Sequence, residues 1–148
     1  MISLQPLTPN QLLLNPKSPI EEKNVLLELK HKFELQFADK DFFLIPSSGS
    51  SKNESESVKL IAISLQAILN SAARFNDYFK VEATPVWGLV LPTFHVAGLA
   101  ILARAHLAKA QVVSINWIPE KMQSWLDMHA VTFLSLVPAQ VYDLVQLK

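Results

Sequence analysis

The chain has 148 residues, of which half are hydrophobic and 18% are charged, and its 13 basic and 13 acidic residues leave no formal net charge. This balance gives no electrostatic footprint for a nucleic-acid partner or an anionic membrane surface. The lack of cysteine excludes disulfides and cysteine-based metal sites, and no apolar run reaches the roughly 18 residues of a membrane span. Because the N-terminus also lacks the pattern of a secretory signal, we expect a cytoplasmic protein.

The first third of the chain predicts an arm, a helix and a strand. Residues 1–19 contain four prolines and predict an irregular arm, which the leucines at 12–14 attach to an apolar surface. A helix is expected from Ser18–Pro19 to about Phe37, because acidic residues occupy its first turn. Its apolar face is expected to consist of Val25, Leu26, Leu29, Phe33 and Phe37.

A serine-rich tract, SSGSSKNESES, occupies residues 47–57 between predicted strands at 42–45 and 58–63. The two strands predict a hairpin with a long connection. Hydroxyl groups and free backbone N–H groups can surround a phosphate, whereas Glu54 and Glu56 would repel one. The tract is therefore compatible with a phosphate-binding loop and with a solvated connection. The Walker pattern and G-x-G-x-x-G are both absent.

The remainder of the chain alternates between helical and strand patterns. Helices are expected at 65–79, 96–109, from 119 onward and at 139–147, with Ser64 as the N-cap of the first. Strands are expected at 86–91, 111–115 and 131–137. This alternation predicts an α/β fold, with a mostly parallel sheet, right-handed βαβ crossovers and a single domain over residues 1–148.

The stretch WGLVLPTFHVAGLAIL, residues 87–102, predicts a ligand site. Pro92 should end the strand, which leaves Phe94 and His95 at its carboxyl end, the edge where open α/β sheets bind ligands. A lone histidine at this place is compatible with a structural role and with a pocket role. The other histidines are expected to be structural, and no spacing of histidines and carboxylates predicts a metal site. No pattern in the chain supports hydrolase chemistry.

Three segments together resemble the adenylate-forming acyl-CoA ligase family. LPTFHVAGL at 91–99 resembles the LPxFHxxGL segment of that family, and SSGSS at 47–51 resembles the start of its phosphate loop, [ST]-S-G-[ST]-[ST]-G-x-P-K. VTFLSLVPAQ at 131–140 resembles its later VTxxxxVPxxL unit. The resemblance covers residues 42–148, and FHVAGLAILAR is most similar to the o-succinylbenzoate–CoA ligases of menaquinone biosynthesis.

The resemblance implies a two-step acid–thiol ligase reaction. A carboxylate attacks the α-phosphate of ATP to give an acyl-adenylate and pyrophosphate, and the thiol of coenzyme A then displaces AMP. The residues implied to bind phosphate, with Mg²⁺ sharing the phosphate charge, are Ser47, Ser48, Gly49, Ser50, Ser51 and Lys59. Those implied to line the acyl-adenylate pocket are Phe94, His95, Gly98, Val137 and Pro138.

The sequence also departs from the family pattern. Lys52 stands at the second glycine position of the phosphate loop and Val58 at its proline position. The later family motifs, including the adenine-binding Y-G-x-T-E segment and the C-terminal catalytic lysine, are absent, so no catalytic residue is assigned within the chain. We therefore expect an incomplete N-terminal domain that is inactive alone and has the C-terminal part of the same ligase as its partner.

Two other hypotheses stay open. The chain could be a non-catalytic interaction module on a degenerate ligase fold, which the altered serine tract would explain. It could also be a stand-alone α/β nucleotide-binding domain, a hypothesis that rests on fold analogy alone. In each case the high apolar content leaves open a homodimer formed through an exposed apolar face.

Overall fold

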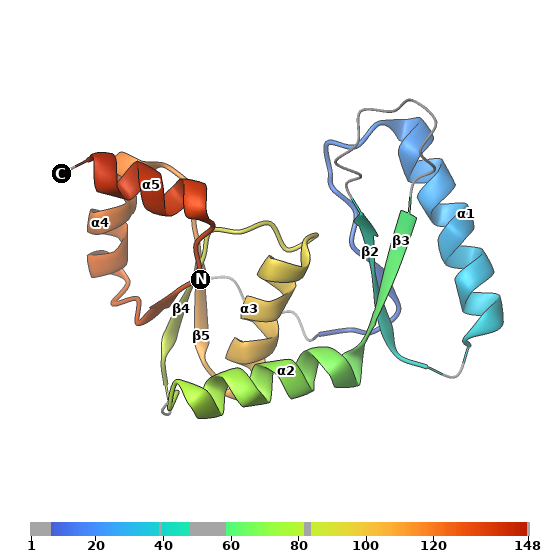
Figure 1. The fold of residues 1–148 in the computed structure, drawn as a ribbon, viewed down its shortest axis with the longest axis horizontal. Helices are drawn as coiled ribbons and strands as arrows, with labels where there is room; N and C mark the ends of the chain where they lie inside the picture. Colours follow the sequence, from blue (N-terminus) through green and yellow to red (C-terminus); the bar gives the residue numbers. More distant parts are fainter. Residues whose placement is uncertain (1–6, 39, 48–58, 82–83, 148) are drawn as a thin grey trace.

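The computed structural model describes residues 7–38, 40–47, 59–81 and 84–147. Within these residues, five helices pack around two three-stranded sheets, of strand orders β1-β2-β3 and β5-β4-β6 (Figure 1). In chain order the elements are β1 (Gln11–Leu12), α1 (Ile20–Gln36), β2 (Phe42–Ser47), β3 (Lys59–Ser64), α2 (Leu65–Tyr78), β4 (Val86–Leu89), α3 (Val96–Leu107), β5 (Gln111–Ser114), α4 (Pro119–Met128), β6 (Phe133–Leu134) and α5 (Pro138–Gln146).

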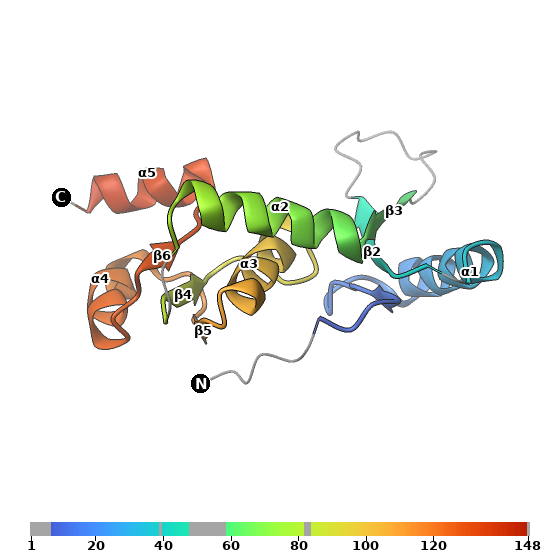
Figure 2. The same cartoon turned by 90° about the horizontal axis from the view of Figure 1, so that it is seen from below.

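The fold class is α/β, as the alternating pattern predicts, but its strands are divided between two sheets. β4, β5 and β6 pair in parallel, whereas β2 and β3 form an antiparallel hairpin. Helix α2 runs from the end of this hairpin to the start of β4 and so extends along both halves of the molecule (Figures 1 and 2). No helix among the described residues is both long enough and apolar enough to cross a membrane.

The first sheet confirms the predicted hairpin and corrects the predicted arm. β2 and β3 pair from Phe42 opposite Ser64 to Ser47 opposite Lys59. The arm is not wholly irregular, because its residues 11 and 12 form β1, which pairs in parallel with β2. β2 also continues through Pro46 to Ser47, two residues beyond the predicted end at residue 45. Pro46 is tolerated because it lies beyond the two residues of β2 that pair with β1.

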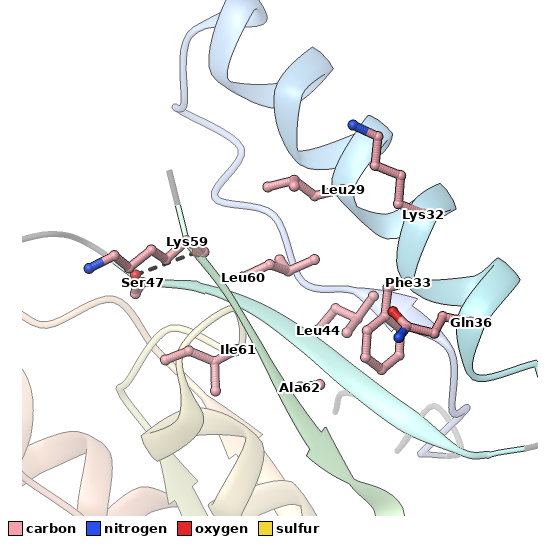
Figure 3. A pocket seen from close by; sticks show the side chains of 10 residues that line it. All are labelled: Leu29, Lys32, Phe33, Gln36, Leu44, Ser47, Lys59, Leu60, Ile61 and Ala62. Carbon is pink, nitrogen blue, oxygen red and sulfur yellow. Dashed lines mark hydrogen bonds between the residues drawn. The ribbon is translucent and has the colours of Figure 1, made fainter. Parts of the chain in front are cut away.

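β2 is covered on both faces, which explains its uncharged sequence. On one face, Phe43 and Ile45 pack against α2 and α3 in a cluster completed by Ile68, Ala72, Leu99 and Ala103. On the other face, Leu44 lies toward α1 (Figure 3). The arm is held by the same core, because Leu13 packs against the first cluster, as the leucine run predicts.

Helix α1 packs less tightly than its sequence predicts. Leu26 is the only fully buried residue of the helix, and Val25, which was expected on the apolar face, is 44% exposed. The end of the helix is fixed by aromatic contacts, because the ring of Phe33 lies 4.8 Å from that of Phe37 and 5.1 Å from that of Phe42. Pro19 occupies the N-cap position and makes no side-chain cap hydrogen bond.

The parallel sheet is built around the central strand β4. β4 ends at Leu89, two residues before the predicted end, and β6 is reduced from the expected 131–137 to two residues. Just before β6, Thr132 also contacts β4, because its N–H donates to the Val86 carbonyl at 2.9 Å. Its hydroxyl accepts from the Val86 N–H at 2.9 Å and donates to the Val86 carbonyl at 3.1 Å.

Trp87 is the centre of the second core. Its indole is 1% exposed, stacks on Phe133 with ring centroids 4.8 Å apart, and lies 5.8 Å from the ring of Phe75 on α2. The guanidinium of Arg104 covers the same Phe75 ring at 3.8 Å, and its burial lowers the pKa of Arg104 below the ordinary value. Trp87 thus joins β4, β6 and α2.

Helices α2, α3 and α4 end in the same hydrogen-bonded motif. Lys80, Lys109 and Ala130 each adopt a left-handed backbone conformation one residue after the C-cap. The next N–H donates to the carbonyl five residues earlier in each case: Val81 to Asn76 at 2.9 Å, Ala110 to Ala105 at 2.8 Å and Val131 to Leu126 at 3.0 Å. These are Schellman motifs with a non-glycine residue at the left-handed position.

Candidate ligand site at the carboxyl edge of the parallel sheet

A cavity of about 610 Å³, here called the edge cavity, lies where β4 and β5 end. Its volume is within the range of small-molecule sites, which is about 300–1,000 Å³. This is the edge where the sequence predicts a ligand site, because the carboxyl ends of parallel strands meet there. It is lined by Asn15, Pro16, Lys17, Leu89, Val90, Leu91, Pro92, Thr93, Phe94, Ser114, Ile115, Asn116 and Trp117.

The turn that carries Phe94 and His95 is held close to α3 by Gly98. A methyl group at Gly98 would lie 2.6 Å from the carbonyl carbon of Pro92 and closer still to its oxygen. Glycine therefore permits the close backbone approach that the sequence predicts, although the backbone that approaches is the protein's own turn. The His95 N–H also donates to the Pro92 carbonyl at 3.2 Å, which closes the turn.

His95 occupies the N-cap position of α3 and leaves its imidazole available. The side chain makes no cap hydrogen bond, the residue is exposed, and its ring lies 4.7 Å from that of Phe94. An imidazole held this way at the positive end of a helix can face an anionic or polar ligand group. The geometry is compatible with the predicted pocket role.

A second, small pocket joins this turn to the start of the serine-rich tract. This junction pocket has a volume of about 80 Å³ and lies beside the edge cavity, with which it shares Asn15 and Phe94. Its lining includes Ser47, at the end of β2, together with Phe94 and His95. Two motifs far apart in the sequence therefore meet at one pocket.

The junction pocket also contains residues that sequence reasoning missed. Asn15 and Ser18 come from the arm, and Glu22 comes from the first turn of α1. The arm is fixed there because the Lys17 N–H donates to the Asn15 side-chain oxygen at 2.9 Å and the Lys23 ammonium donates to the Pro16 carbonyl at 2.9 Å. The local sequence holds a turn signal, Asn-Pro-Lys-Ser-Pro, but no signal for contact with residues 47 and 95.

The predicted phosphate-binding residues are described only in part. Ser47 and Lys59 are paired across the hairpin, and the Ser47 hydroxyl donates to the Lys59 carbonyl at 3.5 Å. Ser48, Gly49, Ser50 and Ser51 lie outside the described residues. The phosphate-binding assignment of all six residues therefore stays a prediction.

Val137 and Pro138 line neither the edge cavity nor the junction pocket. They begin α5, and a hydrogen bond connects that helix to the edge cavity, because the Trp117 indole N–H donates to Asp143 at 3.0 Å. Their assignment to the acyl-adenylate pocket also stays a prediction. Over the described part of the chain, no three histidine, aspartate or glutamate side chains gather in a group that could hold a metal ion.

Solved structures supply the comparison. No protein-family model matches the chain, and no curated protein matches it in sequence. Unliganded o-succinylbenzoate–CoA synthetase from Bacillus subtilis matches 93% of this chain with 17% identity and a TM-score of 0.72. The same enzyme with its acyl-adenylate intermediate matches 72% of the chain with 20% identity and a TM-score of 0.64. The inhibitor-bound N-terminal domain of FACL13 from Mycobacterium tuberculosis matches 72% with 21% identity and a TM-score of 0.63.

The chain shares the fold of part of the adenylate-forming acyl-CoA ligases. It spans 37%, 21% and 26% of the length of these three structures, respectively. At these identities the match establishes fold alone. Other structures of the Bacillus subtilis enzyme were solved with AMP and with ATP and a magnesium ion.

Proposed function

We propose that the chain is the N-terminal part of an ATP-dependent acyl-CoA ligase, an acid–thiol ligase that adenylates a carboxylate and transfers the acyl group to coenzyme A. The observation that carries the proposal is the junction pocket, where Ser47 meets Phe94 and His95. These residues belong to the two segments that resemble the family's phosphate loop and pocket segment. The resemblance of FHVAGLAILAR, residues 94–104, to o-succinylbenzoate–CoA ligases supports o-succinylbenzoate as the acid and menaquinone biosynthesis as the pathway.

The proposed roles follow from the chemistry of each side chain. The hydroxyl of Ser47 and the ammonium of Lys59 bind phosphate oxygens of ATP, together with residues 48–51. The His95 imidazole orients the acid so that its carboxylate oxygen faces the α-phosphate, and the ring of Phe94 covers it. Attack forms the acyl–phosphate bond while the bond to pyrophosphate breaks. In this proposal Val137 and Pro138 form a more distant wall, and Gly98 keeps the turn in place.

The residues fit part of the nucleotide. Ser47 offers a hydroxyl, and Lys59 forms no ion pair within the described residues, so its charge is available to phosphate. The junction pocket, at about 80 Å³, is much smaller than a nucleotide, and Glu22 adds an acidic group to it. ATP binding therefore requires the arm and the start of α1 to move. Mg²⁺ would supply charge neutralisation at the phosphates, with its ligands coming mainly from ATP and water.

The small acidic pocket favours a second candidate, a non-catalytic interaction module on a degenerate ligase fold. Glu22 lines the junction pocket together with Ser47, and its carboxylate would repel a phosphate bound there. Lys52 replaces the glycine that would let a phosphate approach the backbone. A module of this kind would keep the ligase fold and bind no ATP.

Calorimetric titration with ATP of the full-length protein that contains this chain, as the ligase proposal implies, separates the two candidates. Under the ligase proposal, ATP binds saturably and Lys59→Gln weakens binding roughly tenfold, because a charge-assisted hydrogen bond is lost. Glu22→Gln strengthens ATP binding by removing a repulsion. His95→Ala should leave the affinity for ATP unchanged. It should lower the affinity for o-succinylbenzoate, which is titrated in the presence of a non-hydrolysable ATP analogue.

Lys121→Gln is the matched charge control, since Lys121 lies on α4 and lines none of the cavities described here. Its ATP affinity should equal that of the unmodified chain. If ATP gives no saturable heat with the full-length protein, either unmodified or as Glu22→Gln, the ligase proposal is wrong and the interaction module stands. Equal losses from Lys59→Gln and Lys121→Gln would also contradict it.

A further inference from the structure

The edge cavity has a single charged side chain in its lining, and this is Lys17 from the arm. The rest of the lining is neutral and contains no acidic residue. In the described ranges the ion pairs join Lys30 to Glu34 and Lys80 to Asp77, so the ammonium of Lys17 is not neutralised there. The cavity therefore offers one free cation to a ligand.

The backbone of the arm holds Lys17 beside the cavity. The Lys17 N–H donates to the Asn15 side-chain oxygen at 2.9 Å, which closes a turn. The Lys23 ammonium on α1 donates to the Pro16 carbonyl at 2.9 Å and ties this turn to the helix. The side chain of Lys17 is exposed, so its flexible stem can carry the ammonium to a ligand group in the cavity.

The edge cavity and the junction pocket each contain one basic side chain. Lys17 lines the edge cavity and not the junction pocket, whereas His95 lines the junction pocket and not the edge cavity. The two spaces adjoin, because Asn15 and Phe94 line both. A ligand that occupies both would meet a basic group in each of them.

Aromatic side chains line the space that such a ligand would occupy. Phe94 lies where the two spaces adjoin, and Trp117 lines the edge cavity. The Trp117 indole N–H donates to Asp143 at 3.0 Å, so a hydrogen bond from α5 already satisfies its polar edge. Asp143 does not belong to the lining and leaves Lys17 unpaired. The two rings offer apolar contact, at roughly 25 cal/mol for each Å² removed from water.

We propose that Lys17 is a specificity-determining residue that selects acids with a second carboxylate. The inference rests on the proposed function, in which His95 orients the carboxylate that reacts. The body of the acid lies against Phe94 and Trp117, and the carboxylate that does not react accepts a charge-assisted hydrogen bond from Lys17. An acid with one carboxylate would leave the cation facing an uncharged group. The arm, which lies outside the segments that resemble the ligase family, thus contributes to the choice of substrate.

Calorimetric titration of the full-length protein with two matched acids tests the proposal, in the presence of a non-hydrolysable ATP analogue. The acids are o-succinylbenzoate and β-benzoylpropionate, which lacks the ring carboxylate. We expect o-succinylbenzoate to bind roughly fivefold more tightly, the gain from one ion pair at an exposed lysine. Lys17→Gln should remove this preference and Lys17→Arg should keep it. Added salt should weaken the preference in the unmodified protein, because it screens an exposed ion pair.

The controls separate recognition of the second carboxylate from a structural role of the arm. Lys121→Gln should keep the preference for o-succinylbenzoate, since Lys121 lines neither space. ATP affinity should stay the same in Lys17→Gln, because the cation serves the acid and not a phosphate. Equal weakening of both acids by Lys17→Gln would overturn the proposal. So would a preference that persists in that variant, or failure of the unmodified protein to bind either acid.

Pyrophosphate release from ATP, measured on the same proteins, keeps this inference apart from the proposed ligase function. If Lys17→Gln removes the preference but neither acid causes pyrophosphate release, recognition of the second carboxylate stands and the ligase proposal is wrong. If both acids cause release and Lys17→Gln leaves the ratio of their KM values unchanged, the ligase proposal stands and the role of Lys17 is wrong.

Discussion

The hairpin region, residues 7–64, and the parallel-sheet region, residues 65–147, differ in how their helices are packed. Helix α1 of the first region contains one fully buried residue, Leu26. Helix α3 of the second region contains five: Gly98, Leu99, Ile101, Ala103 and Ala105. The parallel-sheet region therefore carries most of the core, and the hairpin region rests on it through one face of β2.

This difference in packing places most of the stability in the parallel-sheet region and access for ligands in the hairpin region. The junction pocket is lined in part by the arm and by the start of the loosely packed helix α1. Elements with few buried contacts open at low free-energy cost, and binding segments are drawn from such elements. We infer that the parallel-sheet region fixes Phe94 and His95, while the hairpin region provides the parts that move when a ligand enters.

The largest expected effect tests the core of the parallel-sheet region. Trp87→Ala removes a side chain that contacts Phe75 and Phe133, and should lower the free energy of unfolding by about 3–5 kcal/mol in urea denaturation. Trp87→Phe should cost much less, because the indole N–H is buried and has no partner within the described residues. Equal losses in the two variants would show that the indole N–H, rather than the ring contacts, matters.

The next effect concerns the hairpin region. Leu26→Ala should lower the free energy of unfolding by about 2 kcal/mol, and Leu35→Ala, at a position 73% exposed on the same helix, by less than about 0.5 kcal/mol. Hydrogen exchange in Leu26→Ala should accelerate at the amides of β2 and β3 while those of β4 and β5 keep their rates. Uniform acceleration over both sheets would contradict a separation between the two regions.

A smaller effect is expected where the parallel-sheet region supports the candidate site. Gly98→Ala places a methyl group against the Pro92 carbonyl and should cost about 1–3 kcal/mol, because backbone must shift. The shift displaces Phe94 and His95, so chemical-shift changes should concentrate at residues 91–99. Ala97→Ser, at the exposed neighbouring position, is the control and should change neither stability nor the spectrum of the turn.

The sequence predicts the order of elements well, because each helix and most strands carry a local signal. Ser64 is an example, since its hydroxyl accepts from the Ala67 N–H at 3.1 Å, as its N-cap position predicts. The strands that the sequence predicts wrongly depend on contacts with residues distant in the chain. β1 is a strand because it pairs with β2, and β6 pairs with β4 only at Phe133 and Leu134. No local sequence pattern indicates either of these contacts.

The candidate site was predictable to a similar extent. The place of Phe94 and His95 follows from the predicted strand end at Pro92. The resemblance assigns Ser47 to phosphate binding, and its meeting with Phe94 and His95 is seen only in the structure. The contribution of Asn15 and Glu22 could not be predicted, because it depends on the path of the arm across the hairpin. The division of the strands into two sheets also could not be predicted from the alternation of strands and helices, because that alternation does not say which strands pair.

The smallest expected effect concerns the Schellman motif that the ends of α2, α3 and α4 share. Its three helix-to-strand connections place Lys80, Lys109 and Ala130 in a left-handed conformation, which costs most residues about 1–2 kcal/mol and glycine much less. Because glycine also makes the unfolded chain more flexible, each change to glycine should raise the free energy of unfolding by about 0.5–1 kcal/mol.

Thermal denaturation measures the sum of these three changes. The effects should add in the triple variant, because the three connections share no hydrogen bond. Ala73→Gly, in the exposed interior of α2, should instead lower the free energy of unfolding by about 1 kcal/mol. If the three glycine variants lose stability as Ala73→Gly does, the left-handed conformation carries no strain. The repeated helix ends would then be held by packing of the strands that follow, and the rigidity of the parallel-sheet region would reside in its sheet alone.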